Sequence, residues 1–198
     1  QTFGGPIQWI VVDDGQAPTE TTAGQTVVRR PPGDGHTLPQ NLAAALPHSV
    51  FPPLFNRYGP GETFGLHVDN AIRFHGGTGA RIRTDLSATL FLTEPDEYEG
   101  GELRIEGNSG TMSYKLPAGS MLLYPSTTLH KVEEVTSGER VSCFMWMQSL
   151  VADHAEREMR YDLDRTTQAL SAERGKSDRE VLVLTQLYHN LVRRWAEA

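Results

Sequence analysis

The sequence is poor in cysteine, in long apolar segments and in net positive charge. Its single cysteine, Cys143, cannot form a disulfide within the chain, and a lone thiol is compatible with a reducing compartment, so we expect a cytoplasmic protein. No apolar run approaches the roughly 20 residues of a membrane-spanning helix. The formal net charge of −7 argues against bulk attraction to nucleic acid or to an anionic membrane, and we expect neither as a partner.

The length and composition suit one ordinary globular domain with an appendage. The 198 residues, 38% hydrophobic and 22% charged, can form a sizeable core. No segment repeats at a fixed period, which argues against a repeat architecture. The chain begins with Gln1 rather than Met, so a preceding native segment, a cleaved signal included, stays open.

The pattern along the chain predicts three parts. Residues 1–42 form a poorly defined N-terminal segment in which residues 7–12 have the composition of a strand. Residues 43–149 contain short extended runs separated by Gly, Pro and Asn, without a helical period, which predicts a sandwich, jelly roll or barrel. The candidate strands are residues 54–58, 63–69, 86–93, 102–106, 111–116, 120–124, 130–135 and 140–148.

Residues 70–84 are predicted to be a long, glycine-rich link. Such a link is either a binding loop or a solvated connection. It contains Arg73, Arg81 and Arg83, which weakly favour an acidic substrate.

Residues 150–198 form a predicted helical extension. A capping box from Ser177 to Glu180 marks the start of the last helix. From Val181 to Trp195, apolar residues recur at helical spacing and form one stripe. Packing of this stripe against the protein's own sheet is the first interpretation, and a homo-oligomer contact is the second.

Three residues have the chemistry of a metal site. His67 and Asp69 lie two apart in a strand-like run, so both side chains point to the same face. His130 begins a later extended stretch, and each residue taken alone is more often structural. Together, two imidazoles and one carboxylate suit an iron(II) ion that keeps positions open for oxygen and a cosubstrate.

Arg140 opens an almost entirely apolar strand, in which it shares a face with Ser142, Phe144 and Trp146. A buried guanidinium needs an anionic partner, because an unpaired buried charge is very costly. Its planar fork suits the carboxylate of a cosubstrate. The alternative is a strand-end arginine whose head group reaches water.

Ordered motifs across residues 43–198 resemble the PKHD-type hydroxylases, bacterial members of the iron(II)/2-oxoglutarate-dependent dioxygenase superfamily. Residues 1–42 match the usual helical start of that family poorly. The motifs are FPPLFNRY at 51–58, HVD at 67–69, RTDLSATLFL at 83–92, GGEL at 100–103, LPAG at 116–119, LYPS at 123–126, LH at 129–130, FMW at 144–146 and LYHNL at 187–191.

The resemblance implies a mainly β fold with α, in which a double-stranded β-helix (jelly roll) core spans residues 43–149 and C-terminal helices span 150–198. It implies that His67, Asp69 and His130 bind Fe(2+) and that Arg140 binds the distal carboxylate of 2-oxoglutarate. Tyr58 looks like the tyrosine that related prolyl hydroxylases place against the same carboxylate.

The implied activity couples decarboxylation of 2-oxoglutarate to succinate with hydroxylation of an unidentified small-molecule or peptide substrate by O2. The resemblance also implies L-ascorbate, which keeps the iron reduced, and a link to siderophore or iron metabolism. Two alternatives stay open. One is a zinc hydrolase that uses the same His/Asp/His set, and the other is a non-catalytic jelly-roll sensor of metal or 2-oxoglutarate.

Overall fold

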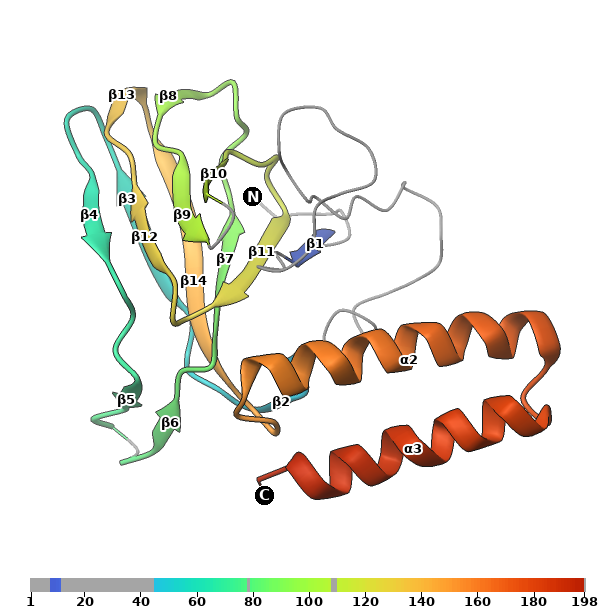
Figure 1. The fold of residues 1–198 in the computed structure, drawn as a ribbon. Coiled ribbons are helices and arrows are strands. Elements are labelled where there is room, and N and C mark those ends of the chain that lie inside the picture. The colour runs from blue at the N-terminus through green and yellow to red at the C-terminus, as the bar shows by residue number, and fades with distance from the viewer. Residues whose placement is uncertain (1–7, 12–44, 78, 108–109, 198) are drawn as a thin grey trace.

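The computed structural model describes residues 8–11, 45–77, 79–107 and 110–197. Figure 1 shows two sheets of strands side by side and a pair of long helices at the C-terminal end of the chain. Among the described residues, no helix is both long and apolar enough to cross a membrane. The predicted mainly β core with C-terminal helices is confirmed.

The larger sheet is organised around one long strand. This strand, β14, runs over ten residues and pairs with three different strands. In spatial order the sheet contains β1 (Gln8–Val11), β11 (Ser120–Pro125), β7 (Leu86–Phe91), β14 (Arg140–Ser149) and β2 (Pro47–Val50), and β3 (Leu54–Tyr58) also pairs with β14. Strand β1 is parallel to β11 and lies within the predicted N-terminal segment. The rest of residues 1–42 lies outside the described residues.

The smaller sheet is antiparallel and contains β10 (Gly110–Tyr114), β9 (Leu103–Gly107), β12 (Leu129–Val132) and β4 (Phe64–His67), in that order. Two further pairs are β8 (Tyr98–Gly100) with β13 (Val135–Gly138), and β5 (Ile72–Phe74) with β6 (Arg81–Arg83). All eight predicted strands overlap a strand of the structure. The strands missed, β2, β5, β6, β8 and β13, have only three or four residues each.

The two sheets enclose a common core. The buried cluster between them draws Phe91 and Leu122 from the larger sheet and Leu103, Ile105 and Val132 from the smaller one. A second cluster lies on the opposite face of the larger sheet and contains Ala45, Leu86, Ala88, Met121, Leu123 and Met147. The central strands are therefore buried on both faces, which explains why β11 and β14 read as nearly continuous apolar runs.

The prediction of a long loop over residues 70–84 is wrong. The segment contains the β5–β6 hairpin, in which Arg73 is opposite Ile82. At its base, the Thr84 amide donates to the Ala71 carbonyl at 2.9 Å, and the Thr84 hydroxyl donates to the Asn70 carbonyl at 2.6 Å. The glycines were interpreted as a sign of a loop over the whole segment, but they lie only near the turn of the hairpin.

The two helices, α2 (His154–Arg174) and α3 (Arg179–Trp195), form an antiparallel hairpin (Figure 1). The N-cap of α3 is Asp178, whose carboxylate accepts from the amides of Glu180 and Val181. The predicted N-cap, Ser177, is therefore one residue too early.

The main contact of α3 is α2 rather than the sheet, which corrects the first interpretation of the apolar stripe. Val181 is buried, whereas Leu182, Val183 and Leu187 are about half exposed. A homo-oligomer contact through these helices stays a prediction, as do the domain boundaries at residues 42 and 149.

Candidate metal centre

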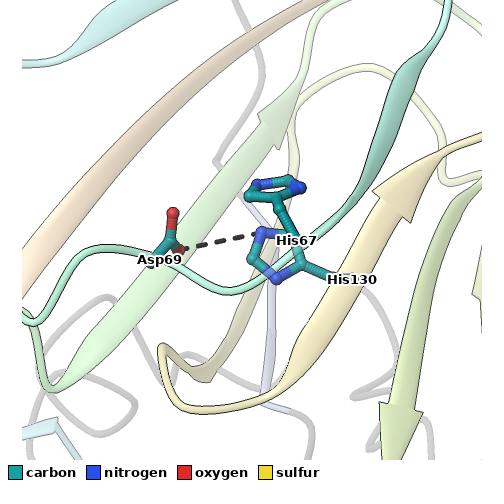
Figure 2. Close-up of side chains that lie close together, drawn as sticks. All are labelled: His67, Asp69 and His130. Carbon is teal, nitrogen blue, oxygen red and sulfur yellow. Dashed lines mark ion pairs between the residues drawn. The ribbon is translucent and has the colours of Figure 1, made fainter.

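The three candidate ligands lie together in the structure. His67 ends β4 and is directly opposite His130 of β12 in the antiparallel register, with 4.2 Å between the ring centroids. Asp69 follows two residues after His67, just beyond the strand. The ligand atoms of all three side chains lie within 4.8 Å of one another, and Figure 2 shows them gathered around one point. His75, on the β5–β6 hairpin, is not part of this group.

Both imidazoles are oriented by backbone carbonyls. The Nδ1 atom of His67 lies 2.8 Å from the Gly65 carbonyl oxygen, and that of His130 lies 3.0 Å from the Thr128 carbonyl oxygen. Because a carbonyl oxygen can only accept, each Nδ1 must carry the proton and donate it. Each Nε2 therefore keeps its lone pair for a metal ion, which is the usual arrangement of a metal-binding histidine.

Burial affects the protonation of His130, and hydrogen bonds orient the Asp69 carboxylate. Burial lowers the pKa of His130, against the opposing influence of its bond to Thr128 and of Asp69, and so favours the neutral ring that a metal requires. The Oδ2 atom of Asp69 lies 3.7 Å from the His130 Nε2 and accepts a hydrogen bond of 2.5 Å from the Ser87 hydroxyl. Ser87 in turn lies 2.7 Å from the Ser126 hydroxyl.

Arg140 is enclosed without a carboxylate partner. Its side chain is among the largest fully buried ones, at 1% exposure, and burial lowers the pKa of the guanidinium, against the opposing influence of nearby tyrosines. The Nη1 atom of Arg140 donates a hydrogen bond to the Ser142 hydroxyl at 2.8 Å. Within the described residues, Nε has no hydrogen-bond partner and no ion pair reaches Arg140. The alternative of a water-exposed strand-end arginine is therefore wrong.

Tyr58 lies beside this guanidinium. It is opposite Arg140 in the β3–β14 register, and its ring centroid is 5.7 Å from the guanidinium carbon. The Asn56 amide donates to the Tyr58 hydroxyl at 3.3 Å, so the phenol keeps its own proton to donate. Burial raises the pKa of Tyr58, which keeps that proton in place near neutral pH.

Tyr124 connects the metal ligands with the arginine. Its ring centroid lies 5.1 Å from that of His130. Burial strongly raises the pKa of its hydroxyl; among the smaller influences, Asp69 raises it and Arg140 lowers it. The Arg140 guanidinium carbon lies 5.4 Å from the ring centroid of Phe91, which belongs with Tyr124 to the core between the sheets. The candidate metal ligands and the buried cation therefore border the same core.

Sequence reasoning missed Ser87, Ser126 and Tyr124. A usable signal was present in β7, where Ser87 and Thr89 alternate with apolar residues in a strand that is buried along most of its length. Polar side chains on the inner face of such a strand need partners, and they often mark a site. The hydrogen bond to Asp69 was not visible, because it joins β7 to the segment that follows β4, and these two strands belong to different sheets.

Two family models match the chain. The model of the 2OG-Fe(II) oxygenase superfamily matches residues 53–148, and the model of the PKHD-type hydroxylase C-terminal domain matches residues 154–197. The first match contains all the candidate site residues, and the second covers both helices.

Similar proteins include two curated bacterial hydroxylases. A PKHD-type hydroxylase of Burkholderia lata is 59% identical over 160 residues, which is 81% of this chain and 70% of the relative. A PKHD-type hydroxylase of Acinetobacter baumannii is 56% identical over 161 residues, which is 81% of this chain and 71% of the relative.

Solved structures are more distant. A Pseudomonas putida prolyl-4-hydroxylase is 26% identical, with a TM-score of 0.42 over 53% of this chain and 55% of that one. The viral collagen prolyl hydroxylase of Paramecium Bursaria Chlorella virus-1, solved with 2OG, is 22% identical, with a TM-score of 0.34 over 49% of this chain and 60% of that one.

Proposed function

Because the chain belongs to the PKHD-type hydroxylases of the 2OG-Fe(II) oxygenase superfamily, we propose that it binds iron(II) through His67, Asp69 and His130 and binds 2-oxoglutarate through Arg140. The observation that carries this proposal is the pairing of a convergent His/Asp/His set with a buried, uncompensated guanidinium in one interior. Membership of the family makes the protein an oxygenase that acts as a hydroxylase.

The donor set fits iron(II). Two imidazole nitrogens and one carboxylate oxygen approach a common point from β12 and from β4 with its following residues. This 2-His-1-carboxylate arrangement occupies one side of the ion and leaves positions for a cosubstrate and oxygen. When bound, iron and 2-oxoglutarate supply oxygen activation and oxidative decarboxylation, while the protein positions the reactants and excludes water.

The surroundings of Arg140 fit the distal carboxylate of 2-oxoglutarate. A guanidinium with 1% exposure and an unused Nε is costly unless an anion compensates it. Tyr58 adds a protonated hydroxyl that can donate to the same carboxylate. The Ser142 hydroxyl accepts from Arg140 and donates to the side-chain Oδ1 of Asn56, which holds the guanidinium in place for a bidentate contact.

The alternatives explain less. A zinc hydrolase would use the same three ligands but would give Arg140 no role, and a sensor would bind both groups without turnover. The relatives are named as hydroxylases, which favours the oxygenase over both.

The complete reaction consumes O2 and 2-oxoglutarate, releases succinate and carbon dioxide, and hydroxylates a small-molecule or peptide substrate. L-ascorbate is the expected reductant that keeps iron ferrous. A link to siderophore or iron metabolism and a cytoplasmic location stay predictions.

Succinate formation from 2-oxoglutarate and binding of iron(II) test the proposal. We expect His67→Ala, Asp69→Ala and His130→Ala to lose iron and turnover. Arg140→Gln should keep iron but need at least about tenfold more 2-oxoglutarate, because one charge-assisted pair is lost. Arg57→Gln, which removes an exposed arginine next to Tyr58, is the matched control. Unchanged 2-oxoglutarate affinity in Arg140→Gln would contradict the assignment.

A further inference from the structure

Arg73 lies next to the candidate metal ligands and belongs to none of the roles proposed so far. It is in β5, on the hairpin that Figure 1 shows beyond the end of β4. Its Nη2 atom lies 4.0 Å from the Asp69 Oδ1. About a third of the side chain, 32%, is exposed, so a solute can reach it. Arg73 therefore lies at the entrance to the site.

A rigid aromatic platform fixes the Arg73 guanidinium. Its central carbon lies 3.7 Å from the centroid of a Trp146 ring, which is a close cation–π stack. Trp146 is 4% exposed and has Phe51 and Phe144 edge-on against it, at 5.7 and 5.4 Å. Because the platform is packed from several sides, the cation is already oriented before any ligand binds, which lowers the entropy lost on binding.

The other two arginines of the hairpin do not share this position. Arg83 donates to both Asp85 oxygens, at 2.7 and 3.1 Å, and to Glu197 at 2.5 Å, so its charge is compensated within the protein. Arg81 is exposed at the start of β6. Of the three arginines that weakly favoured an acidic substrate, Arg73 is the one that forms an ion pair with a candidate metal ligand among the described residues.

The hydrogen-bonding capacity of Arg73 is not used within the described part of the chain. Its Nε is buried without a hydrogen-bond partner, and its one ion pair is the distant contact with Asp69. If iron binds as proposed, the same carboxylate must serve a dication as well as this guanidinium. Arg73 then lacks a counter-charge of its own, which is unfavourable in a partly desolvated site.

The balance of charge indicates which group is missing. Iron(II), Arg140 and Arg73 together carry one more positive charge than Asp69 and the 2-oxoglutarate dianion carry negative charge. One carboxylate would neutralise the site, whereas a phosphate monoester would exceed this balance. The planar fork of arginine also matches a carboxylate geometrically.

We infer that the primary substrate carries a carboxylate, which Arg73 binds beside the iron while Trp146 holds the guanidinium in place. This inference rests on the proposed function and specifies the class of substrate. Arg73 lies 4.0 Å from Asp69, so a carboxylate bound to Arg73 lies close to the proposed iron. The substrate carbon that is hydroxylated is therefore only a few bonds away from that carboxylate.

Anaerobic binding to the protein loaded with iron(II) and saturating 2-oxoglutarate tests the inference. The probes are straight-chain carboxylates, their primary amides and the matching phosphate monoesters. Binding is followed by calorimetry and by the change in the visible absorption of the iron–2-oxoglutarate complex. We expect the acids to bind at least about tenfold more tightly than the amides. Arg73→Gln should abolish this preference, and Arg81→Gln, which removes the same charge from an exposed neighbour, should preserve it.

Several binding results would overturn the inference. The wild-type protein could bind acids and amides equally or bind neither, or it could bind phosphate monoesters more tightly than acids. The preference for acids could also survive in Arg73→Gln. Loss of iron or 2-oxoglutarate binding in Arg73→Gln would instead assign the residue to orienting Asp69 and would also reject it. If the wild-type protein forms no iron–2-oxoglutarate complex, the proposed function fails and the inference falls with it. A normal complex without acid preference rejects the inference alone.

Discussion

Ser87 shows how a single residue of the larger sheet acts on a candidate ligand that follows a strand of the smaller one. Its hydroxyl donates to Asp69 and contacts the Ser126 hydroxyl, and its side chain is only 2% exposed. Hydrogen bonds of this kind set the orientation of a ligating carboxylate. The candidate metal centre therefore depends on both sheets, although its three proposed ligands come from β4, the residue pair after it, and β12.

Replacing Ser87 with alanine should weaken iron(II) binding by about tenfold, because Asp69 loses the bond that orients it. Iron titration under anaerobic conditions measures the effect. Ser137→Ala, which changes an exposed serine of β13, should leave the affinity unchanged. An iron affinity in Ser87→Ala that equals the wild-type value would show that Asp69 is held by other contacts.

The site residues differ in how far sequence could identify them. His67 and Asp69 are two positions apart in a strand-like run, so the period of a strand predicted that they share a face, although β4 ends at His67. The role of Tyr124 depends on its ring contact with His130 of β12. No local pattern encodes that contact, so sequence reasoning did not find it.

At the scale of elements, the antiparallel pair of β8 and β13 depends on glycine. Gly100 has a φ of +72°, and a Cβ atom there would lie 2.0 Å from the Glu134 carbonyl oxygen. Backbone and side-chain space therefore both require glycine. This strand pair matters to the site, because β8 carries Tyr98, which opposes the lowering of the Arg140 pKa by burial.

Gly100→Ala should lower the free energy of unfolding by about 3 kcal/mol, since backbone strain and a steric clash add together. Gly61→Ala is the matched control: Gly61 has a φ of +82° but no atom within 4 Å of the added Cβ, so strain alone should cost about 1 kcal/mol. Urea denaturation of both variants tests the difference. Equal losses would mean that β8 can shift away from Glu134 at little cost.

Elements with strong local signals were predicted and weak ones were not. The long strand β14 and the helix α3 carry apolar patterns over many residues, and these patterns are visible without any partner. The strands β5 and β6 have three residues each, too few for a period to show. Their pairing with each other supplies the stability that their local sequence lacks.

At the scale of the whole molecule, Asp85 joins three parts of the chain. Its side chain is 5% exposed. It accepts from Arg83 at the end of the β5–β6 hairpin and, at 2.8 Å, from the Ser149 amide at the end of β14. Arg83 extends the connection to Glu197, near the C-terminal end of the chain. The hairpin that carries Arg73 is thereby fixed to the core and to the helical extension.

Asp85→Ala should lower the free energy of unfolding by about 3 kcal/mol, because it leaves the Ser149 amide and Arg83 without their buried acceptor. Glu133→Gln removes a carboxylate from the more exposed pair with Arg104 and should cost less than about 1 kcal/mol. Thermal and chemical denaturation compare the two. A small effect of Asp85→Ala would mean that water replaces the carboxylate and that the three parts are joined by other contacts.

The sequence by itself determined the class of fold, the helical extension and the candidates for the metal ligands and for the anion-binding arginine, because these follow from local patterns and from residue chemistry. Tertiary structure decided how the candidate ligands meet and which further arginine reaches them. His67 faces His130 only because β4 pairs with β12, and Arg73 reaches the site only because a hairpin places it on Trp146. Contacts between residues far apart in the chain depend on strand pairing, and no local pattern of the sequence specifies that pairing.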